Sequence, residues 1–227
     1  LELGARRSAQ DRVTLAGGTL TTNRTWDFSG LPVHLTGDFR VGGNTKLTIV
    51  PGTVVKMPLG AFFAVNGTLD APGTASAPIV FTTDRDDSVG GDSNGDSANT
   101  LPVPGLWEAL YLEAGSDASV LDHVDVRYAG NACSPENNGG GCRTSAVQIT
   151  GGSSPTLKDT NLLFSENTGL YIAGGTSHLQ KVHIEGSGDQ AIFQELGADP
   201  TYDGVTATHN RFDRVTLNSG TLTSNRT

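Results

Sequence analysis

A chain of 227 residues with a net charge of −9 lacks the clustered Lys and Arg side chains that displace counterions from phosphate, so we expect no nucleic-acid partner. None of its apolar stretches approaches the roughly 18–20 residues that cross a bilayer, which predicts no membrane span. With 30 glycines and only 17% charged residues, the composition is typical of turn-rich β structure and not of helices.

The first predicted elements recur at the other end of the chain. Residues 11–25 read DRVTLAGGTLTTNRT and residues 213–227 read DRVTLNSGTLTSNRT, which is 12 of 15 identical positions at an offset of 202 residues. This offset is too long for one turn of a solenoid, so we interpret it as the period of a larger tandem module. The sequence therefore predicts a single domain over 1–227, made of one module (11–212) and the start of the next copy (213–227).

Between these copies, short runs of alternating apolar and polar residues are separated by Gly or Asn. In the first half they lie within 39–57, 61–73 and 77–83. In the second half, segments starting near 155 and 177 repeat the same pattern at a spacing of about 22 residues. Such coils bury apolar side chains only by stacking on one another, with Gly and Asn at the corners. The prediction is an all-β, right-handed parallel β-helix (solenoid).

An acidic segment near 84–104 interrupts the coils and is predicted to protrude from the solenoid. The spacing Asp-x-Asn-x-Asp over 92–96 is that of calcium loops, which aim successive oxygens at one ion. Ser97 and Val103 stand where a complete EF-hand loop has Gly and Glu, so a solvated acidic loop remains the alternative. The candidate calcium ligands are Asp84, Asp86, Asp87, Asp92, Asn94 and Asp96.

Two cysteines, Cys133 and Cys142, lie in a Gly-rich segment near 131–143. Their spacing would close a small loop, and no His or Cys partner for zinc stands nearby, so we favour a disulfide over two free thiols. A disulfide predicts an oxidising compartment.

No catalytic constellation is predicted. Asp122 and Asp125, with His123 between them and Arg127 beyond, offer paired carboxylates, but outward polar residues on a strand are the preferred interpretation. Trp26 and Trp107 each stand beside apolar residues, which favours packing in the core over a sugar-binding platform.

Several phrases in order resemble the β-helix modules of large bacterial secreted and cell-surface proteins. They are KLTIVPGTVVKM, FFAVNGTLDAPG, APIVFTT, the acidic loop and PVPGLWEALYL, within residues 39–130. The resemblance implies an extracellular, cell-surface location and supplies no catalytic residues. We therefore expect a non-enzymatic structural or adhesive module whose partner is itself, through end-to-end stacking or covalent tandem copies that form a rod or filament. The alternative is a β-helix that binds surface glycans or cleaves polysaccharide.

Overall fold

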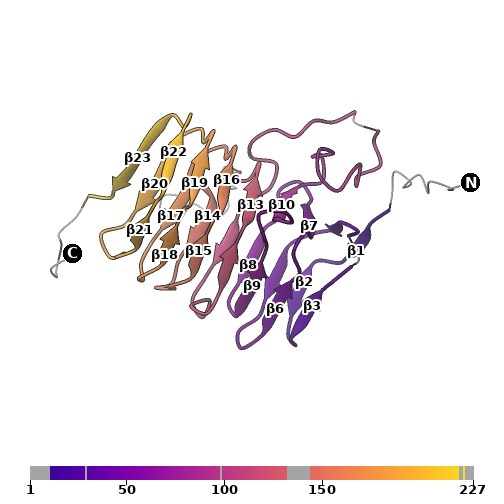
Figure 1. Cartoon of the computed structure of the whole chain (residues 1–227), viewed down its shortest axis with the longest axis horizontal. Helices are drawn as coiled ribbons and strands as arrows, with labels where there is room; N and C mark the ends of the chain where they lie inside the picture. Colours follow the sequence, from indigo (N-terminus) through magenta and orange to yellow (C-terminus); the bar gives the residue numbers. More distant parts are fainter. Residues whose placement is uncertain (1–10, 29, 98, 132–143, 220–221, 223–227) are drawn as a thin grey trace, which may run out of the picture.

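The computed structural model describes residues 11–28, 30–97, 99–131, 144–219 and 222. Over these residues the chain forms 23 short strands and no helix, arranged in three parallel sheets of eight, eight and seven strands (Figure 1). Within each sheet, a strand pairs with strands three places away in the sequence. The chain is thus a parallel β-solenoid, which confirms the predicted all-β parallel β-helix.

Each turn of the solenoid contributes one strand to each sheet, and we name the sheets A, B and C. Sheet A contains β1 (Val13–Leu15), β4 (Val33–Leu35), β7 (Val54–Met57), β10 (Ile79–Thr83), β13 (Val124–Arg127), β16 (Asn161–Leu163), β19 (His183–Glu185) and β22 (Thr206–Thr208). Sheet B contains β2 (Gly18–Leu20), β5 (Phe39–Val41), β8 (Phe63–Val65), β11 (Leu110–Leu112), β14 (Ser145–Ile149), β17 (Thr168–Ile172), β20 (Gln190–Gln194) and β23 (Phe212–Leu217). Sheet C contains β3 (Arg24–Trp26), β6 (Lys46–Ile49), β9 (Thr68–Pro72), β12 (Val120–Asp122), β15 (Thr156–Lys158), β18 (His178–Gln180) and β21 (Thr201–Asp203).

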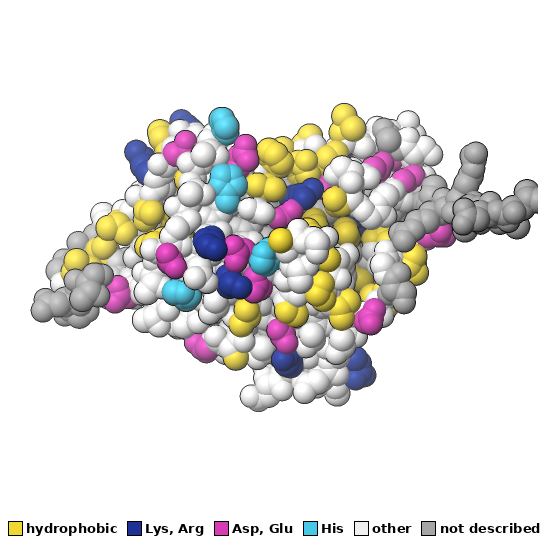
Figure 2. All heavy atoms as spheres, in the orientation of Figure 1, with side chains coloured by type: hydrophobic (Ala, Val, Ile, Leu, Met, Phe, Trp, Pro, Cys, Tyr) yellow, Lys and Arg dark blue, Asp and Glu magenta, His cyan; other side chains and the backbone are white. Residues whose placement is uncertain are grey.

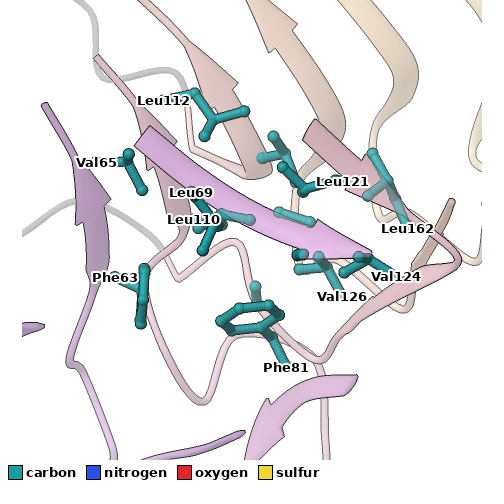
Figure 3. Close-up of a cluster of buried hydrophobic side chains, with 14 of the residues drawn as sticks. Phe63, Val65, Leu69, Phe81, Leu110, Leu112, Leu121, Val124, Val126 and Leu162 are labelled. Atoms are coloured by element: carbon teal, nitrogen blue, oxygen red, sulfur yellow. The ribbon is translucent and has the colours of Figure 1, made fainter. Parts of the chain in front are cut away.

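Inward-facing side chains of successive turns stack in columns along the axis. In sheet A, Phe81 pairs with Val55 on one side and with Val126 on the other, and all three are fully buried. Figure 3 shows Phe81, Val126 and side chains from the other sheets converging on the same interior. Burial of each such side chain contributes about 1.5–3 kcal/mol, which no single turn could obtain alone.

Both tryptophans belong to the core, as predicted. Trp26 is 5% exposed and its ring lies 5.1 Å from that of Phe39. Trp107 is fully buried, and its indole Nε1 donates a 2.8 Å hydrogen bond to the carbonyl oxygen of Arg127. Neither ring is presented to solvent as a stacking platform.

One insertion leaves the solenoid without disturbing its register. It lies between β10 and β11 and includes the acidic loop, yet Phe81 and Val126 on either side of it remain direct neighbours in sheet A. A second insertion in the sequence lies between β13 and β14. Residues 132–143, and with them the predicted Cys133–Cys142 disulfide, fall outside the described part of the chain.

The corner between sheets C and A is formed by a column of residues with positive φ. His123, Asp159 and Lys181 occupy it in successive turns, with φ of 49°, 45° and 50°. The backbone N–H of each donates to a carbonyl of the following turn, at 3.0, 2.9 and 2.6 Å. We expected Gly and Asn at such corners, but here the hydrogen bonds between turns offset the roughly 1–2 kcal/mol cost of a left-handed residue with a side chain.

Candidate functional site

The acidic loop folds back along the outer face of sheet A toward the first turn (Figure 1). The Arg12 guanidinium, just before β1, donates a 2.5 Å hydrogen bond to the carbonyl oxygen of Ser93. A Cβ on Gly90 would lie 3.0 Å from Pro32 Cβ and 3.3 Å from Val54 Cγ1, so the loop backbone also packs on this face. The loop therefore leaves the solenoid as predicted and then packs against β7 and against the residues just before β1 and β4.

A buried lysine lies beneath the loop. Lys56, on the outer face of β7, is fully buried, and its Nζ donates to the carbonyl oxygen of Asp86. Burial lowers the pKa of Lys56 from its ordinary value, and the carboxylates of Asp86 and Asp87 oppose this shift. Lys56 is therefore a resident cation for the loop. Strand alternation places its side chain on the outer face, and the sequence alone did not single out this contact.

Asp86 is the loop residue most tightly held against the solenoid. It is fully buried, and its carboxylate accepts hydrogen bonds from Thr82 Oγ1 at 2.8 Å and from the N–H of Ser88 at 3.2 Å. Asp84 turns instead toward His34, with 3.6 Å between its Oδ2 and His34 Nε2. These two predicted calcium ligands attach the loop to sheet A and do not face the other candidates.

The structure brings together three of the six predicted ligands. Carboxylate oxygens of Asp87, Asp92 and Asp96 lie within 4.8 Å of one another. Asn94 is turned toward Asp96, since its Nδ2 donates to that carboxylate at 3.1 Å and its Oδ1 accepts the N–H of Asp96 at 3.2 Å. Asn94 thus lies beside this cluster, with its amide donor directed at the Asp96 carboxylate.

The donor set of this cluster fits calcium, which prefers carboxylate and other hard oxygen ligands. Asp92 is oriented by the turn that follows it, accepting the N–H of Gly95 at 2.6 Å and of Ser97 at 2.9 Å. In the described residues, Asp87 Oδ1 is buried and accepts no hydrogen bond. Burial raises the pKa of Asp87, and the charge of Asp92 raises it further. A cation bound here would offset both effects.

A second group of possible ligands is already neutralised by lysines. Asp122, His123 and Asp159 also place oxygen or nitrogen atoms within 4.8 Å of one another. Lys158 Nζ donates to Asp122 at 2.7 Å and lies 3.8 Å from Asp159, while Lys181 lies 3.8 Å from Asp159 on the other side. Acidic, basic and histidine side chains accordingly lie side by side near the middle of the face in Figure 2. This arrangement is a ladder of ion pairs along the corner.

The carboxylates considered for catalysis have separate partners. Asp122 is held by Lys158 and by His123 Nδ1 at 2.7 Å. Asp125 accepts from Arg127 at 2.6 Å and from Asn161 at 2.7 Å. The two carboxylates therefore belong to different hydrogen-bond networks on the surface.

At the C-terminal end the interior of the solenoid is open. A cavity of about 410 Å³ lies among residues of the last turn, including Leu196, Tyr202, Val215 and Leu217. Val215 is 43% and Leu217 57% exposed, although both continue the inward columns of sheet B below Ile192 and Gln194. At the opposite end, the side chains of Val13, Leu15 and Leu20 are only partly buried. Both terminal turns thus present apolar side chains along the axis.

Comparisons of this chain with family models, curated proteins and solved structures find no match. Among the described residues, no helix has the length and apolar character needed to cross a bilayer.

Proposed function

We propose that this chain is a structural module that continues end to end with further copies of itself into a rod or filament outside the bacterial cell. The observation that carries the proposal is the open C-terminal turn. There, β21, β22 and β23 are the last strands of their sheets in the described part of the chain, and residues of β21 and β23 line the apolar cavity. Edge strands with an adjacent apolar surface favour pairing with another chain.

The occupant we propose for this end is the first turn of a second copy. Strands β1, β2 and β3 run in the same direction as the terminal strands and supply one strand to each sheet. Leu15 and Leu20 of that copy would pack on the inward-facing side chains at the C-terminal end. The apolar side chains of both ends would then be buried against each other. The 12 identical positions between 11–25 and 213–227 show that a first-turn sequence is also present at the C-terminal end.

The adhesive role and the cell-surface location rest on the resemblance of residues 39–130 to bacterial surface modules. A parallel solenoid suits such a role because its length grows by about 4.8 Å for each added turn. Each turn contacts only its neighbours, so copies can be added without a change in the existing core.

Association is tested with a matched pair of substitutions on one strand. Val215→Lys puts a charge into the open cavity, whereas Thr216→Lys puts the same charge on the outer face of β23. We expect concentration-dependent association of the native chain and of Thr216→Lys in sedimentation velocity, with rods in negative-stain micrographs, and loss of both in Val215→Lys. The proposal is overturned if the native chain stays monomeric at high concentration, or if the two variants associate equally.

Calcium is the second part of the proposal, with Asp87, Asp92 and Asp96 as the residues that would hold it. The ion would supply charge neutralisation and would order the loop against sheet A. An ion that binds only the folded chain raises the melting temperature in proportion to the logarithm of its concentration. We expect this rise with calcium for the native chain and not for Asp87→Asn, with Asp70→Asn, on the distant β9, as the control. Equal melting temperatures with calcium and with EDTA would refute it.

A further inference from the structure

The two copies of the repeated segment occupy different sheets. In the first copy, β1 pairs with β4, so Val13 to Leu15 belong to sheet A. In the second copy, the same sequence lies in β23 and pairs with β20, so it belongs to sheet B. Figure 1 shows the two strands at opposite ends of the solenoid.

Over the described residues, the first five positions of the two copies nevertheless have a similar local structure. Arg12 Nε donates to Thr14 Oγ1 at 3.3 Å, and Arg214 Nε donates to Thr216 Oγ1 at 3.2 Å. In both copies the Arg and Thr side chains lie on the outer face, while the Val and Leu between and after them continue the inward columns. The copies therefore differ in their position around the axis and not in the strand that they form.

The number of strands explains the change of sheet. In the described residues, the repeat from β1 to the strand before β23 contains 22 strands, which is seven turns of three strands and one strand more. We propose that each copy of the module is rotated by one sheet relative to the copy before it. This inference rests on the proposed tandem continuation, and it places the acidic loops of three successive copies on three different sheets.

The rotation assigns a binding role to Arg214. Arg12 anchors the acidic loop by donating to the Ser93 carbonyl. Arg214 is its counterpart in the next copy, and its guanidinium lies over the Phe212 ring, 4.3 Å from the centroid. In the rotated arrangement, the acidic loop of the following copy covers this part of sheet B, and Arg214 donates to the equivalent carbonyl. The partner of this surface is thus the acidic loop of a second copy.

The position of the second copy can be tested in the isolated chain. In a Cys133→Ser/Cys142→Ser background, Phe193→Cys with Thr216→Cys places thiols on paired residues of β20 and β23. Thr14→Cys with His34→Cys does the same for β1 and β4 and is the positive control. We expect both pairs to be linked by a short bifunctional thiol reagent, whereas Thr208→Cys with Thr216→Cys is not. Efficient linkage of the Thr208 pair alone would show that the segment lies on sheet A and would overturn the inference.

The rotation itself is tested in the full chain extended after residue 227 by a copy of residues 26–212, which completes the second copy that begins at residue 213. Spin labels at Ser88 and at its equivalent would lie about 35 Å apart if both loops faced the same side, given about 4.8 Å for each turn. We expect a longer separation, because labels over different sheets are also displaced sideways around the axis, and this displacement combines with the axial one. A distribution centred near 35 Å would overturn the rotation. Neither experiment requires association between chains, so a failure of the end-to-end proposal would be recognised separately.

Discussion

Replacement of Lys56 by methionine is the substitution that most directly tests how the acidic loop is attached. Methionine has a similar length and volume, so the side chain of Lys56→Met can fill the same space on β7 without a large cavity. What it loses is the ammonium group, which donates to the Asp86 carbonyl and lies among acidic side chains of the loop. The substitution therefore removes the resident cation and leaves the packing nearly unchanged.

The expected loss of stability follows from the burial of both partners. Lys56 and Asp86 are each fully buried. A buried carbonyl that loses its donor costs about 1–3 kcal/mol, and the cost is greatest where the lost donor is charged. Since the acidic side chains around Lys56 also lose a nearby cation, we expect the upper part of this range, about 3 kcal/mol. For a chain of this size that loss lowers the melting temperature by about 6–12 °C.

The assay is urea unfolding followed by circular dichroism, together with limited proteolysis of the loop. Lys46→Met is the control, because Lys46 forms a 2.6 Å ion pair with Asp70 but is half exposed. An exposed pair contributes at most about 1 kcal/mol. We expect Lys56→Met to unfold at lower urea and to be cleaved within 84–104 much faster than Lys46→Met. Equal unfolding free energies and equal cleavage rates of the two variants would refute the role given to Lys56.

Three further outcomes are expected. Gly67→Ala should lower the free energy of unfolding by about 3 kcal/mol or more, because the new Cβ would lie 2.2 Å from the Thr45 carbonyl oxygen. Gly43→Ala is the control and should be neutral, since its Cβ would have no neighbour nearer than 3.8 Å. Thermal melts of the two variants check this. The pKa of Asp87 is raised in the folded chain, so its carboxyl holds its proton more strongly there than in the unfolded chain. Ionisation of this carboxyl therefore lowers the free energy of unfolding as the pH rises from about 4 through the raised pKa. Without calcium, Asp87→Asn should therefore unfold at higher urea than the native chain at pH 7, and a lower midpoint would contradict this. Leu110→Ala removes a fully buried side chain and should cost about 2–5 kcal/mol, and a loss under 1 kcal/mol in urea unfolding would contradict its place in the core.

The solenoid was predictable because its signal is local and repeated. Period-two alternation identified strands such as β16 and β19, and the spacing between them predicted that Leu162 would stack on Ile184, as it does. Corners were less predictable. Residues such as His123 and Lys181 adopt positive φ because the turns above and below hold their backbone, and no property of the residue itself indicates this.

The loop shows where sequence reasoning stops. The spacing of Asp92 and Asp96 correctly indicated carboxylates that lie close together, and Asp87 joined them. The path of the loop over β4 and β7 decides which of its acidic residues attach to the solenoid. Contacts between residues about 30 positions apart, such as Lys56 and Asp86, set that path. The sequence feature that could have indicated this contact is the position of Lys56 between two inward-facing residues, Val55 and Met57.

The corner column constrains how such a protein can gain or lose turns. His123, Asp159 and Lys181 stand in consecutive turns, about 4.8 Å apart along the edge, with carboxylate and cation alternating. Duplication of the single turn that carries Lys181 would place two ammonium groups in neighbouring positions, where like charges repel. Duplication of both turns together, the one with Asp159 and the one with Lys181, keeps opposite charges adjacent, so this edge favours growth by pairs of turns.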